Sequence, residues 1–449
     1  MNSANRQTKK QPKAPGTLRQ IRSWGAEACR QGLEPVLYRL GISAYATGVD
    51  VAAMRMPKAR LLSRGQHQVW QRLEKGIDPD ARYIWIHAAS LGEFEQGRPL
   101  MERIRRQLPE HKILLTFFSP SGYEVRKNWE GAALVCYLPF DTPRRVSRFL
   151  DIVRPEKAIF VKYEIWRNYL RLLWKRQIPA YLISAVFRPD QAFFKKRSAW
   201  YRYWLRWYTR IFVQDERSRA LLHGAGIDNV EVCGDTRFDR VADIRAAARN
   251  IEGLARFRHS DSRPVMVAGS SWPADENVYL PWLRTNRTRM KLVIAPHEFD
   301  EKRIAALTSL DGLRCVRFSE LEKDTSLADD ADVVVMDCFG LLSSAYRYAD
   351  LAYVGGGFGA GIHNINEAAV YGIPVVFGPR HGKFLEAAGL IAAGGAFSID
   401  GNKSFAALLD GLLSTDAGRQ SAGRAAGEYI SSKLGTTDRI FRAIFGPGN

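Results

Sequence analysis

The chain has 449 residues, of which 46% are apolar, 25% charged and 11% aromatic, and this composition is typical of a globular protein rather than a disordered or fibrous one. At about 150 residues per domain, the length predicts two or three domains. The formal net charge of +19 favours an anionic partner, such as nucleic acid, anionic lipid or a phosphorylated substrate.

Cysteine usage and hydropathy argue against two further classes of protein. Five scattered cysteines, none paired at metal-binding spacing, argue against a disulfide framework and for a reducing compartment: Cys29, Cys136, Cys233, Cys315 and Cys338. We expect neither a secretory signal nor a spanning helix, since no segment reaches the ~18 uninterrupted apolar residues that a span needs. Residues 41–54 come nearest but include Asp50, so this segment could lie on a membrane surface without crossing it.

The N-terminal region is basic. Residues 1–16 are polar and aperiodic, which predicts disorder, and residues 17–75 look helical. The first 60 residues hold 11 Lys and Arg against 3 Asp and Glu, so this end forms a basic arm.

From residue 82 onward, apolar strands alternate with helical segments, a pattern that predicts parallel sheets covered on both faces by helices. The first strands are expected at 82–89, 112–118, 133–137, 157–161, 180–184, 210–214 and 229–233. After a helix and polar linker near 241–263, a second series is expected at 264–269, 291–296, 313–318, 332–337, 351–356, 373–378 and 395–399. We therefore predict two Rossmann-like α/β domains that face each other across a cleft, with helices near 415–446 that could cross back to brace the first domain.

Ligands of such sheets bind beyond the carboxyl ends of the strands, so functional residues are expected there. In "HAASLGE", Ser90 and Glu93 fit a helix capping box, and Glu93 fits a general base equally well. Gly92 leaves room for a substrate beside the backbone. In "SPSG", Ser119, Ser121 and Gly122 open a helix that can bind an anion, and the alternative is an ordinary Ser-Pro turn.

Two further features follow in the first half of the chain. Glu164 in "YEIW" can pair with Lys162 or Arg167, or it can orient an acceptor sugar. Residues 188–210 carry seven Lys and Arg, one acidic residue and eight aromatics. This segment can stack on nucleic-acid bases, lie at a membrane interface, or supply core aromatics with solvated charges.

The second half offers candidates for binding an anionic ligand. Ser270 lies in a Gly-Ser-Ser loop that can cradle phosphate but lacks the lysine of a Walker motif. His297 follows the next strand and is either structural or a donor to phosphate. Gly340 follows a later strand, and five glycines within 355–361 predict a flexible loop.

A helix expected from about His363-Asn364 carries Glu367. The late position of the glycine-rich loop disfavours an NAD fingerprint. Two Asp-x-Asp triplets, Asp78–Asp80 and Asp330–Asp332, precede strands rather than follow them, so we predict no catalytic metal and no cofactor.

Taken in order, these motifs resemble one family. They are "HAASLGE", "SPSG", "YEIW", "GDTRFDR", "GSSW", "PHE", "MDCFG" and "GGGFGAGIHNINEAAVYGIPVVFGP", and together they resemble the 3-deoxy-D-manno-octulosonic acid (Kdo) transferases over about residues 80 to 440. The resemblance implies a GT-B fold and an inverting, metal-independent transfer of Kdo from CMP-Kdo. The implied acceptor is the 6′-hydroxyl of the lipid A precursor, lipid IVA, in lipopolysaccharide biosynthesis.

The resemblance also assigns a role to each candidate. Glu93 matches the catalytic base, and the acceptor-binding residues are Ser119, Ser121, Gly122 and Glu164. The donor-binding residues are Ser270, His297, Gly340, Asn364 and Glu367, with Glu367 on the ribose. Two departures stand out: Pro296 is followed directly by His297 where many members have an intervening Arg, and Leu341 stands where many have Glu.

We place the domains accordingly. The basic arm and membrane-associating helices occupy 1–75, the acceptor-binding domain 76–245, the CMP-sugar-binding domain 260–430, and a C-terminal helix that could return to the first domain 431–449. The expected partners are CMP-Kdo, the lipid A precursor and an anionic membrane surface. The expected location is the cytoplasmic face of a bacterial inner membrane, peripheral or monotopic.

Two alternatives stay open. One is another GT-B enzyme that uses a UDP-sugar, as a transferase or epimerase. The other is a non-enzymatic nucleic-acid binder, which the charge would suit, although no RRM, KH or helix-turn-helix signature is present. We therefore expect no nucleic-acid partner.

Overall fold

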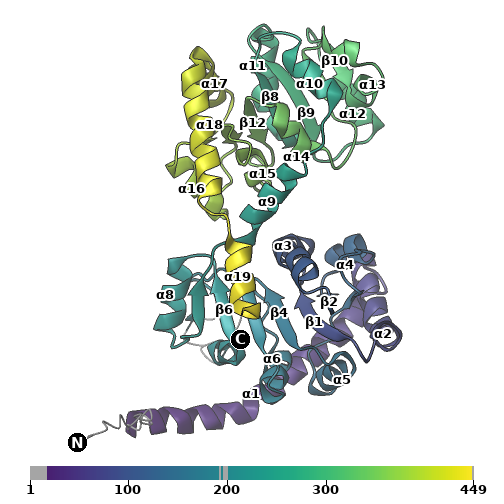
Figure 1. The fold of residues 1–449 in the computed structure, drawn as a ribbon, viewed down its shortest axis with the longest axis vertical. Helices are drawn as coiled ribbons and strands as arrows, with labels where there is room; N and C mark the ends of the chain where they lie inside the picture. Colours follow the sequence, from purple (N-terminus) through teal and green to yellow (C-terminus); the bar gives the residue numbers. More distant parts are fainter. Residues whose placement is uncertain (1–17, 192–193, 196–200, 447–449) are drawn as a thin grey trace, which may run out of the picture. The chain divides into compact units, whose positions relative to one another are not determined.

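The computed structural model describes residues 18–191, 194–195 and 201–446, with side chains from residue 35 onward except that of Tyr201. The segment 1–16 that we predicted to be disordered lies outside the described residues, as does part of the basic aromatic segment 188–210. Two seven-stranded sheets organise the described chain (Figure 1).

The first sheet has the strand order β3-β2-β1-β4-β5-β6-β7, with Ile84 of β1 paired in parallel to Ile113 on one side and Lys157 on the other. Its strands are β1 Arg82–His87, β2 His111–Phe117, β3 Leu134–Tyr137, β4 Lys157–Val161, β5 Ala180–Ala185, β6 Arg210–Val213 and β7 Val230–Val232. The helices of this part are α1 Leu18–Ala52, α2 Pro57–Gly76, α3 Leu91–Gln107, α4 Pro120–Arg126, α5 Pro143–Val153, α6 Arg167–Lys175, α7 Tyr201–Trp204, η3 Leu205–Trp207 and α8 Glu216–Gly224.

The second sheet is also parallel, with the order β10-β11-β9-β8-β12-β13-β14. Its strands are β8 Val265–Ser271, β9 Lys291–Pro296, β10 Cys315–Arg317, β11 Val333–Val335, β12 Leu351–Val354, β13 Val375–Phe377 and β14 Ala396–Ser398. Its helices are α10 Glu252–His259, α11 Pro273–Thr285, α12 Glu301–Thr308, α13 Phe318–Leu321, η4 Thr325–Ala328, α14 Leu342–Ala345, η5 Tyr346–Tyr348, α15 Asn366–Ala369, α16 Leu385–Ala392, α17 Asn402–Ser414 and α18 Asp416–Ser431. In sequence, α9 Thr236–Ala246 lies between the two sheets, and α19 Thr436–Phe445 ends the described chain.

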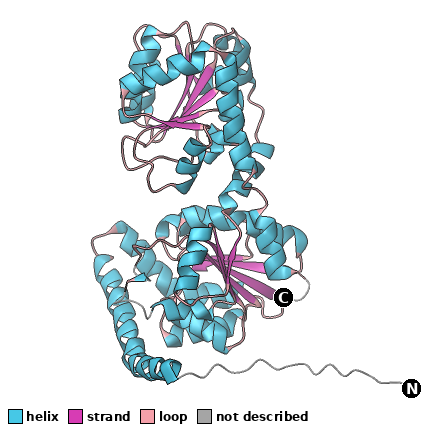
Figure 2. Ribbon diagram, turned by 90° about the vertical axis from the view of Figure 1, so that its left-hand side faces the viewer, coloured by secondary structure: helices cyan, strands magenta, loops and turns pink. Residues whose placement is uncertain are grey.

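Helices enclose both faces of each sheet, as Figure 2 shows, and this explains why most strand residues are apolar. Along β8, Met266 and Ala268 belong to one apolar cluster while Val265 and Val267 belong to the other, because successive strand side chains point to opposite faces. Each of the fourteen predicted strands overlaps an observed strand, so the predicted alternation is confirmed.

Helix α2 covers the exposed edge of β3, the outermost strand of the first sheet. The Gln66 side-chain amide donates to the Leu138 carbonyl at 2.7 Å and accepts from the Phe140 N–H at 3.1 Å. Arg72 donates to the Val135 carbonyl at 3.1 Å. The unpaired backbone groups of an edge strand can pair with another chain. The side chains of α2 make hydrogen bonds with some of these groups instead.

Helix α1 has a packed face and an apolar exposed face. Val49 on the packed face is 8% exposed, and the Tyr38 hydroxyl donates to buried Asp141 at 2.6 Å. On the other face, the exposed apolar side chains are Val36, Leu37, Leu40 and Val51, with exposed fractions between 53% and 65%. None of the helices in the described part of the chain combines the length and apolar character that a membrane span needs.

The expected polar linker near 241–263 is wrong in part. Residues 252–259 form α10, and Leu254 and Phe257 on it are buried against Phe318 and Leu321. These apolar residues recur at helical spacing, so the segment belongs to the core of the second sheet rather than to a solvated connection.

Candidate functional site

Each sheet has a point at which the strand order reverses along the chain, and ligands of α/β sheets bind beyond the carboxyl ends of the strands there. In the first sheet this point lies between β1 and β4, and in the second between β8 and β12.

A buried His–Glu pair joins the ends of β1 and β4. His87 is the last residue of β1 and is 0% exposed, and its Nε2 lies 3.1 Å from Glu164 Oε2. A carboxylate only accepts, so Nε2 carries the proton. The Trp166 indole donates to the same Glu164 oxygen at 2.6 Å.

Two partners of Glu164 were not among those considered in the sequence. They are His87 and Trp166, while pairing with Lys162 or Arg167 stays a prediction. His87 was missed, although a lone polar residue closing the apolar strand "YIWIH" was a usable signal. The pair holds one Glu164 oxygen from two directions, which fixes the orientation of the carboxylate.

The "SPSG" segment lies against the loop that follows β1. The Ser119 N–H donates to the Ala89 carbonyl at 2.7 Å. The Ser119 hydroxyl caps α4 by accepting from the Ser121 N–H at 3.3 Å, while Ser121 itself is exposed. A Cβ at Gly122 would lie 3.0 Å from the Ser90 carbonyl carbon, so the glycine permits this close approach.

Glu93 lies in the first turn of α3 and is half-buried. Because α3 begins at Leu91, Ser90 occupies the position before the helix and Glu93 the third helical position, as the capping-box spacing requires. A Cβ on Gly92 would meet no atom within 4 Å, so there is open space beside this turn. The position therefore remains compatible with helix capping and with proton abstraction from a bound hydroxyl.

At the edge of the second sheet, three rings form a stack. His297 lies between Trp272, at a centroid distance of 4.6 Å, and His363, at 4.3 Å. The Trp272 indole N–H points at His363 Nε2 at 3.2 Å, so this nitrogen accepts and the ring proton sits on Nδ1. Burial, with a further contribution from nearby His297, lowers the pKa of His363, which favours the neutral ring.

Asp275 anchors the backbone beneath this stack. It is 0% exposed and accepts from the Trp272 N–H at 3.0 Å, the Gly356 N–H at 2.9 Å and the Tyr353 hydroxyl at 3.0 Å. The sequence had not pointed to Asp275, although an Asp at the third position of a helix, three residues after the N-cap Trp272, is a capping signal.

The glycine-rich stretch and the Gly-Ser-Ser segment pack closely against neighbouring backbone. Ser270 is part of β8 rather than of a loop, at a break in the ladder where its φ is +51°. A Cβ on Gly355 would lie 2.2 Å from the Ser270 carbonyl oxygen, and one on Gly357 2.6 Å from Gly378. The glycines thus permit close backbone packing and Asp275 holds the Gly356 N–H, while the flexibility of this loop stays a prediction.

The segment that carries Glu367 is shorter than predicted. Helix α15 begins at Asn366 instead of at 363–364 and lasts one turn, and the Asn364 side-chain oxygen accepts from the Asn366 N–H at 3.3 Å just before it. The Asn364 amide donates to Glu367 Oε1 at 2.9 Å. Ser343, from α14, donates to Glu367 Oε2 at 2.7 Å. Both carboxylate oxygens are therefore oriented, one of them by a residue 24 positions away that no local pattern indicated.

Gly340 lies in the exposed loop between β11 and α14, with a φ of +83° that favours glycine. The structure thus brings Asn364 and Glu367 together and places His297 in the ring stack. Ser270 lies against Gly355, and Gly340 precedes the helix that carries Ser343.

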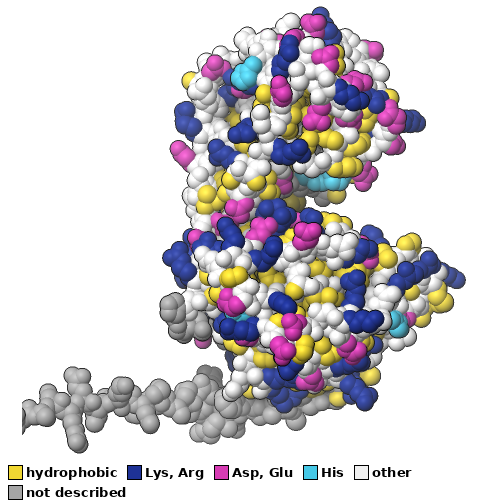
Figure 3. Space-filling model, turned by 45° about the vertical axis from the view of Figure 1, so that its right-hand side comes forward, with side chains coloured by type: hydrophobic (Ala, Val, Ile, Leu, Met, Phe, Trp, Pro, Cys, Tyr) yellow, Lys and Arg dark blue, Asp and Glu magenta, His cyan; other side chains and the backbone are white. Residues whose placement is uncertain are grey.

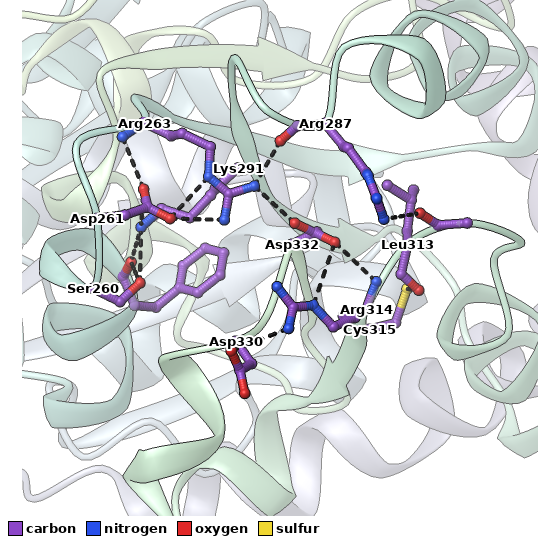
Figure 4. Close-up of polar contacts among 12 residues, drawn as sticks. Ser260, Asp261, Arg263, Arg287, Lys291, Leu313, Arg314, Cys315, Asp330 and Asp332 are labelled. Atoms are coloured by element: carbon purple, nitrogen blue, oxygen red, sulfur yellow. Dashed lines mark hydrogen bonds and ion pairs between the residues drawn. The ribbon is translucent and has the colours of Figure 1, made fainter.

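No group of three potential metal-binding side chains occurs within the described residues. The second Asp-x-Asp triplet belongs to a network at the start of β11 (Figure 4). Asp332 is 3% exposed and accepts from Arg263 at 2.7 Å and from the Arg314 N–H at 3.1 Å, and Arg314 also pairs with Asp330 at 3.1 Å. These carboxylates neutralise arginines and link the strand to its neighbours.

In the described part of the basic aromatic segment 188–210, most of the large side chains are buried in the core. Trp204, Leu205 and Tyr208 are at most 2% exposed, and Tyr203 is 37% exposed. Of the three readings considered, buried core aromatics therefore describe these residues. On the face drawn in Figure 3, Lys and Arg are interspersed with Asp and Glu rather than gathered in one stripe.

Known proteins are similar in sequence to this chain over most of its length. A family model described as 3-deoxy-D-manno-octulosonic-acid transferase (kdotransferase) matches residues 63–240. A 3-deoxy-D-manno-octulosonic acid transferase of Bordetella pertussis is 30% identical over 388 residues, which cover 82% of this chain and 87% of that protein. The Haemophilus influenzae transferase of the same name is 25% identical over 375 residues, covering 81% and 86%.

Solved structures share the fold. UDP-GlcNAc 2-epimerase from Neisseria meningitidis, bound to UDP-GlcNAc, gives a TM-score of 0.56 at 13% identity and covers 81% of this chain and 99% of its own. MurG from Acinetobacter baumannii gives 0.51 at 11%, covering 81% and 99%. The fold class is therefore GT-B. Since the B. pertussis relative matches across most of both chains, this chain belongs to the 3-deoxy-D-manno-octulosonic acid transferase family and is a glycosyltransferase.

Proposed function

We propose that this enzyme transfers Kdo from CMP-Kdo to the 6′-hydroxyl of the lipid A precursor lipid IVA, with inversion and without a metal ion, in lipopolysaccharide biosynthesis. Family membership supports the reaction class. The structural observation that carries the mechanism is the position of Glu93, a carboxylate in the first turn of the helix that follows β1, beside open space at Gly92.

Glu93 acts as the general base. An alcohol becomes a competent nucleophile when a carboxylate at hydrogen-bond distance takes its proton as the new bond forms. The partial positive charge at a helix start favours the ionised carboxylate, which is the form a base needs. Ser119, Ser121, Gly122 and Glu164 line the same edge of the sheet and bind the acceptor, with Glu164 held by His87 and Trp166.

The second sheet binds the donor. Glu367 has each oxygen oriented by a neighbouring donor, and it accepts from the ribose hydroxyls in this proposal. His297 and Ser270 face the phosphate and the sugar carboxylate. The proton on Nδ1 of His363 gives this edge a further donor, which the sequence had not assigned.

We propose further that the enzyme works as a peripheral protein at the cytoplasmic face of the inner membrane. Its acceptor carries acyl chains, and α1 presents Val36, Leu37, Leu40 and Val51 to solvent. Residues 36, 37, 40 and 51 share one face at 100° per residue. Such a face can enter the lipid interface while the positively charged protein is attracted to anionic lipid.

The experiment that tests the function is a transfer assay with CMP-Kdo and tetra-acylated lipid A precursor, with products identified by mass spectrometry. Glu93→Gln should retain CMP-Kdo binding and lose about 10²- to 10⁴-fold in turnover, the usual contribution of a general base. Glu102→Gln is the matched control, because Glu102 lies on the same helix and pairs with Arg98 at 2.7 Å. Normal turnover by Glu93→Gln would reject the base assignment.

The donor is tested separately. Thermal stabilisation of the wild-type protein by CMP but not by UDP is expected, since a ligand stabilises the state that it binds. Stabilisation by UDP alone would instead favour a UDP-sugar enzyme with the same fold.

A further inference from the structure

Building on the proposed CMP-sugar donor, we propose that Phe339, backed by Phe299, is a stacking platform for the base of the nucleotide. The two rings lie nearly parallel, 4.6 Å apart with an interplanar angle of 23°. The platform lies at the carboxyl ends of β9 and β11, the edge at which the donor residues gather.

Phe299 and Phe339 differ in how they are held. Phe299 is half-buried and packs against the apolar cluster that includes Ile304 and Leu307 of α12. Phe339 rests on Phe299 with one face and is 77% exposed, the highest exposed fraction of any large apolar side chain whose surroundings are described. One aromatic ring is thus fixed beneath while the other keeps a face open to a ligand.

The backbone around Phe339 is anchored on both sides. Asp337 accepts from the Ser319 N–H at 2.9 Å and from its hydroxyl at 2.5 Å. Cys338 and Leu341 pack against the core cluster, and Gly340 turns the chain with a φ of +83°. Because its neighbours are held, Phe339 is presented outward by the local backbone geometry.

The platform lies close in sequence and space to the carboxylate proposed to hold the ribose. Ser343, four residues after Phe339, donates to Glu367 Oε2 at 2.7 Å. A base is attached directly to its ribose, so a ribose on Glu367 leaves the base beside the loop that carries Phe339. Stacking suits this place, because every base has a π-face and aromatic rings bind it in an offset parallel arrangement.

Stacking contributes affinity for a base without reading its exocyclic groups. The prediction therefore concerns the strength of nucleotide binding rather than the choice between cytosine and uracil. It also distinguishes the base from the rest of the donor. Removal of the Phe339 ring should weaken the binding of CMP and leave the binding of a ligand without a base unchanged.

The test compares binding of CMP and of ribose 5-phosphate to wild type, Phe339→Ala and Phe339→Trp by calorimetry. Phe339→Ala should weaken CMP about tenfold, in line with the measured contribution of one base stack, and leave ribose 5-phosphate unchanged, while Phe339→Trp keeps the CMP affinity. Cytosine H5 and H6 resonances should shift upfield on binding to wild type but less with Phe339→Ala. Leu327→Ala, at a 39% exposed leucine, is the matched control.

The possible results distinguish failure of the stacking proposal from failure of the proposed function. Equal CMP affinity for wild type and Phe339→Ala would overturn the stacking platform and leave the proposed function standing. Equal weakening of CMP and ribose 5-phosphate would also overturn it, since the ring would then support the loop instead of the base. Failure of wild-type protein to bind CMP would overturn the proposed donor itself.

Discussion

The His87–Glu164 pair shows how a buried side chain can orient a carboxylate, here the one proposed to bind the acceptor. Glu164 is 9% exposed, and His87, with its other ring nitrogen 2.9 Å from the Thr116 hydroxyl and 3.1 Å from the Thr116 carbonyl, cannot turn away. The imidazole therefore holds one Glu164 oxygen in place. We infer that His87 acts as a positioning residue for the acceptor side of the reaction.

Replacement of His87 should separate stability from turnover. His87→Leu removes the N–H donor from a buried carboxylate, which should lower the free energy of unfolding by about 1–3 kcal/mol. It should also lower kcat with little change in KM for CMP-Kdo, because the proposed donor site lies at the other sheet. Urea unfolding and steady-state transfer assays measure the two effects.

His87→Gln is the conservative control, since its amide retains a donor that can point at Glu164. Recovery of kcat in this variant would support positioning through the hydrogen bond. If His87→Leu instead loses stability but keeps full kcat, His87 is only a core residue.

At this scale the sequence indicated positions but not partners. Strand ends marked Glu93, Glu164 and His297, because polar residues follow apolar runs there, whereas Glu367 was placed on the helix expected after the glycine-rich loop. One partner of Glu164, His87, lies 77 residues away, and one partner of Glu367, Ser343, lies 24 away. Such pairings depend on strand order, which a single sequence read by periodicity does not give.

Elements were predictable in proportion to the strength of their pattern. Strands buried on both faces are continuous apolar runs, so all fourteen were found within a few residues. Short helices such as α15, of four residues, lack a full period, and its predicted start was wrong. Helix α10 was not predicted because most of its residues are polar. Its apolar face, which includes Leu254 and Phe257, is recognisable only from its burial in the core.

Asp141 joins three elements, and its protonation should affect stability. The carboxylate is 0% exposed and accepts from the Tyr38 hydroxyl on α1 and from the N–H groups of Asn168 and Tyr169 at the start of α6. Burial raises the pKa of Asp141 to about 6, against the opposing effect of these hydrogen bonds. The folded state therefore binds a proton that the unfolded chain, near its ordinary pKa of about 4, has already released.

The sign follows from proton linkage. Between about pH 4 and pH 6 the folded state holds more protons, so this group makes the free energy of unfolding fall as pH rises, by up to about 3 kcal/mol. Urea unfolding from pH 4 to pH 7 should show a flatter dependence for Asp141→Asn than for wild type. Tyr38→Phe removes a hydrogen bond that lowers the pKa of Asp141, so it should steepen the dependence; identical profiles for all three proteins would contradict the assignment.

The whole molecule combines a net charge of +19 with an exposed apolar face on α1. Charge alone would suit nucleic acid as well as lipid. The apolar face discriminates between them, because a nucleic-acid backbone offers nothing to cover Leu37 and Leu40, whereas a lipid interface does. The charge and the apolar face should therefore both contribute to membrane binding. Salt should weaken the first contribution, and substitution of the apolar residues should weaken the second.

The last prediction separates these terms by vesicle sedimentation of the full chain. Binding to phosphatidylglycerol vesicles should weaken as NaCl rises from about 0.05 to 0.5 M, since the Debye length then falls from about 14 Å to about 4 Å. The double variant Leu37→Glu/Leu40→Glu should weaken binding at every salt concentration, because it removes two leucine side chains from the lipid interface. Full burial of each would contribute about 1.5–3 kcal/mol. Leu327→Glu introduces one glutamate at an exposed leucine outside α1 and should bind nearly as wild type does. If the α1 variant and this control bind equally, α1 does not enter the interface, and charge alone accounts for any attachment.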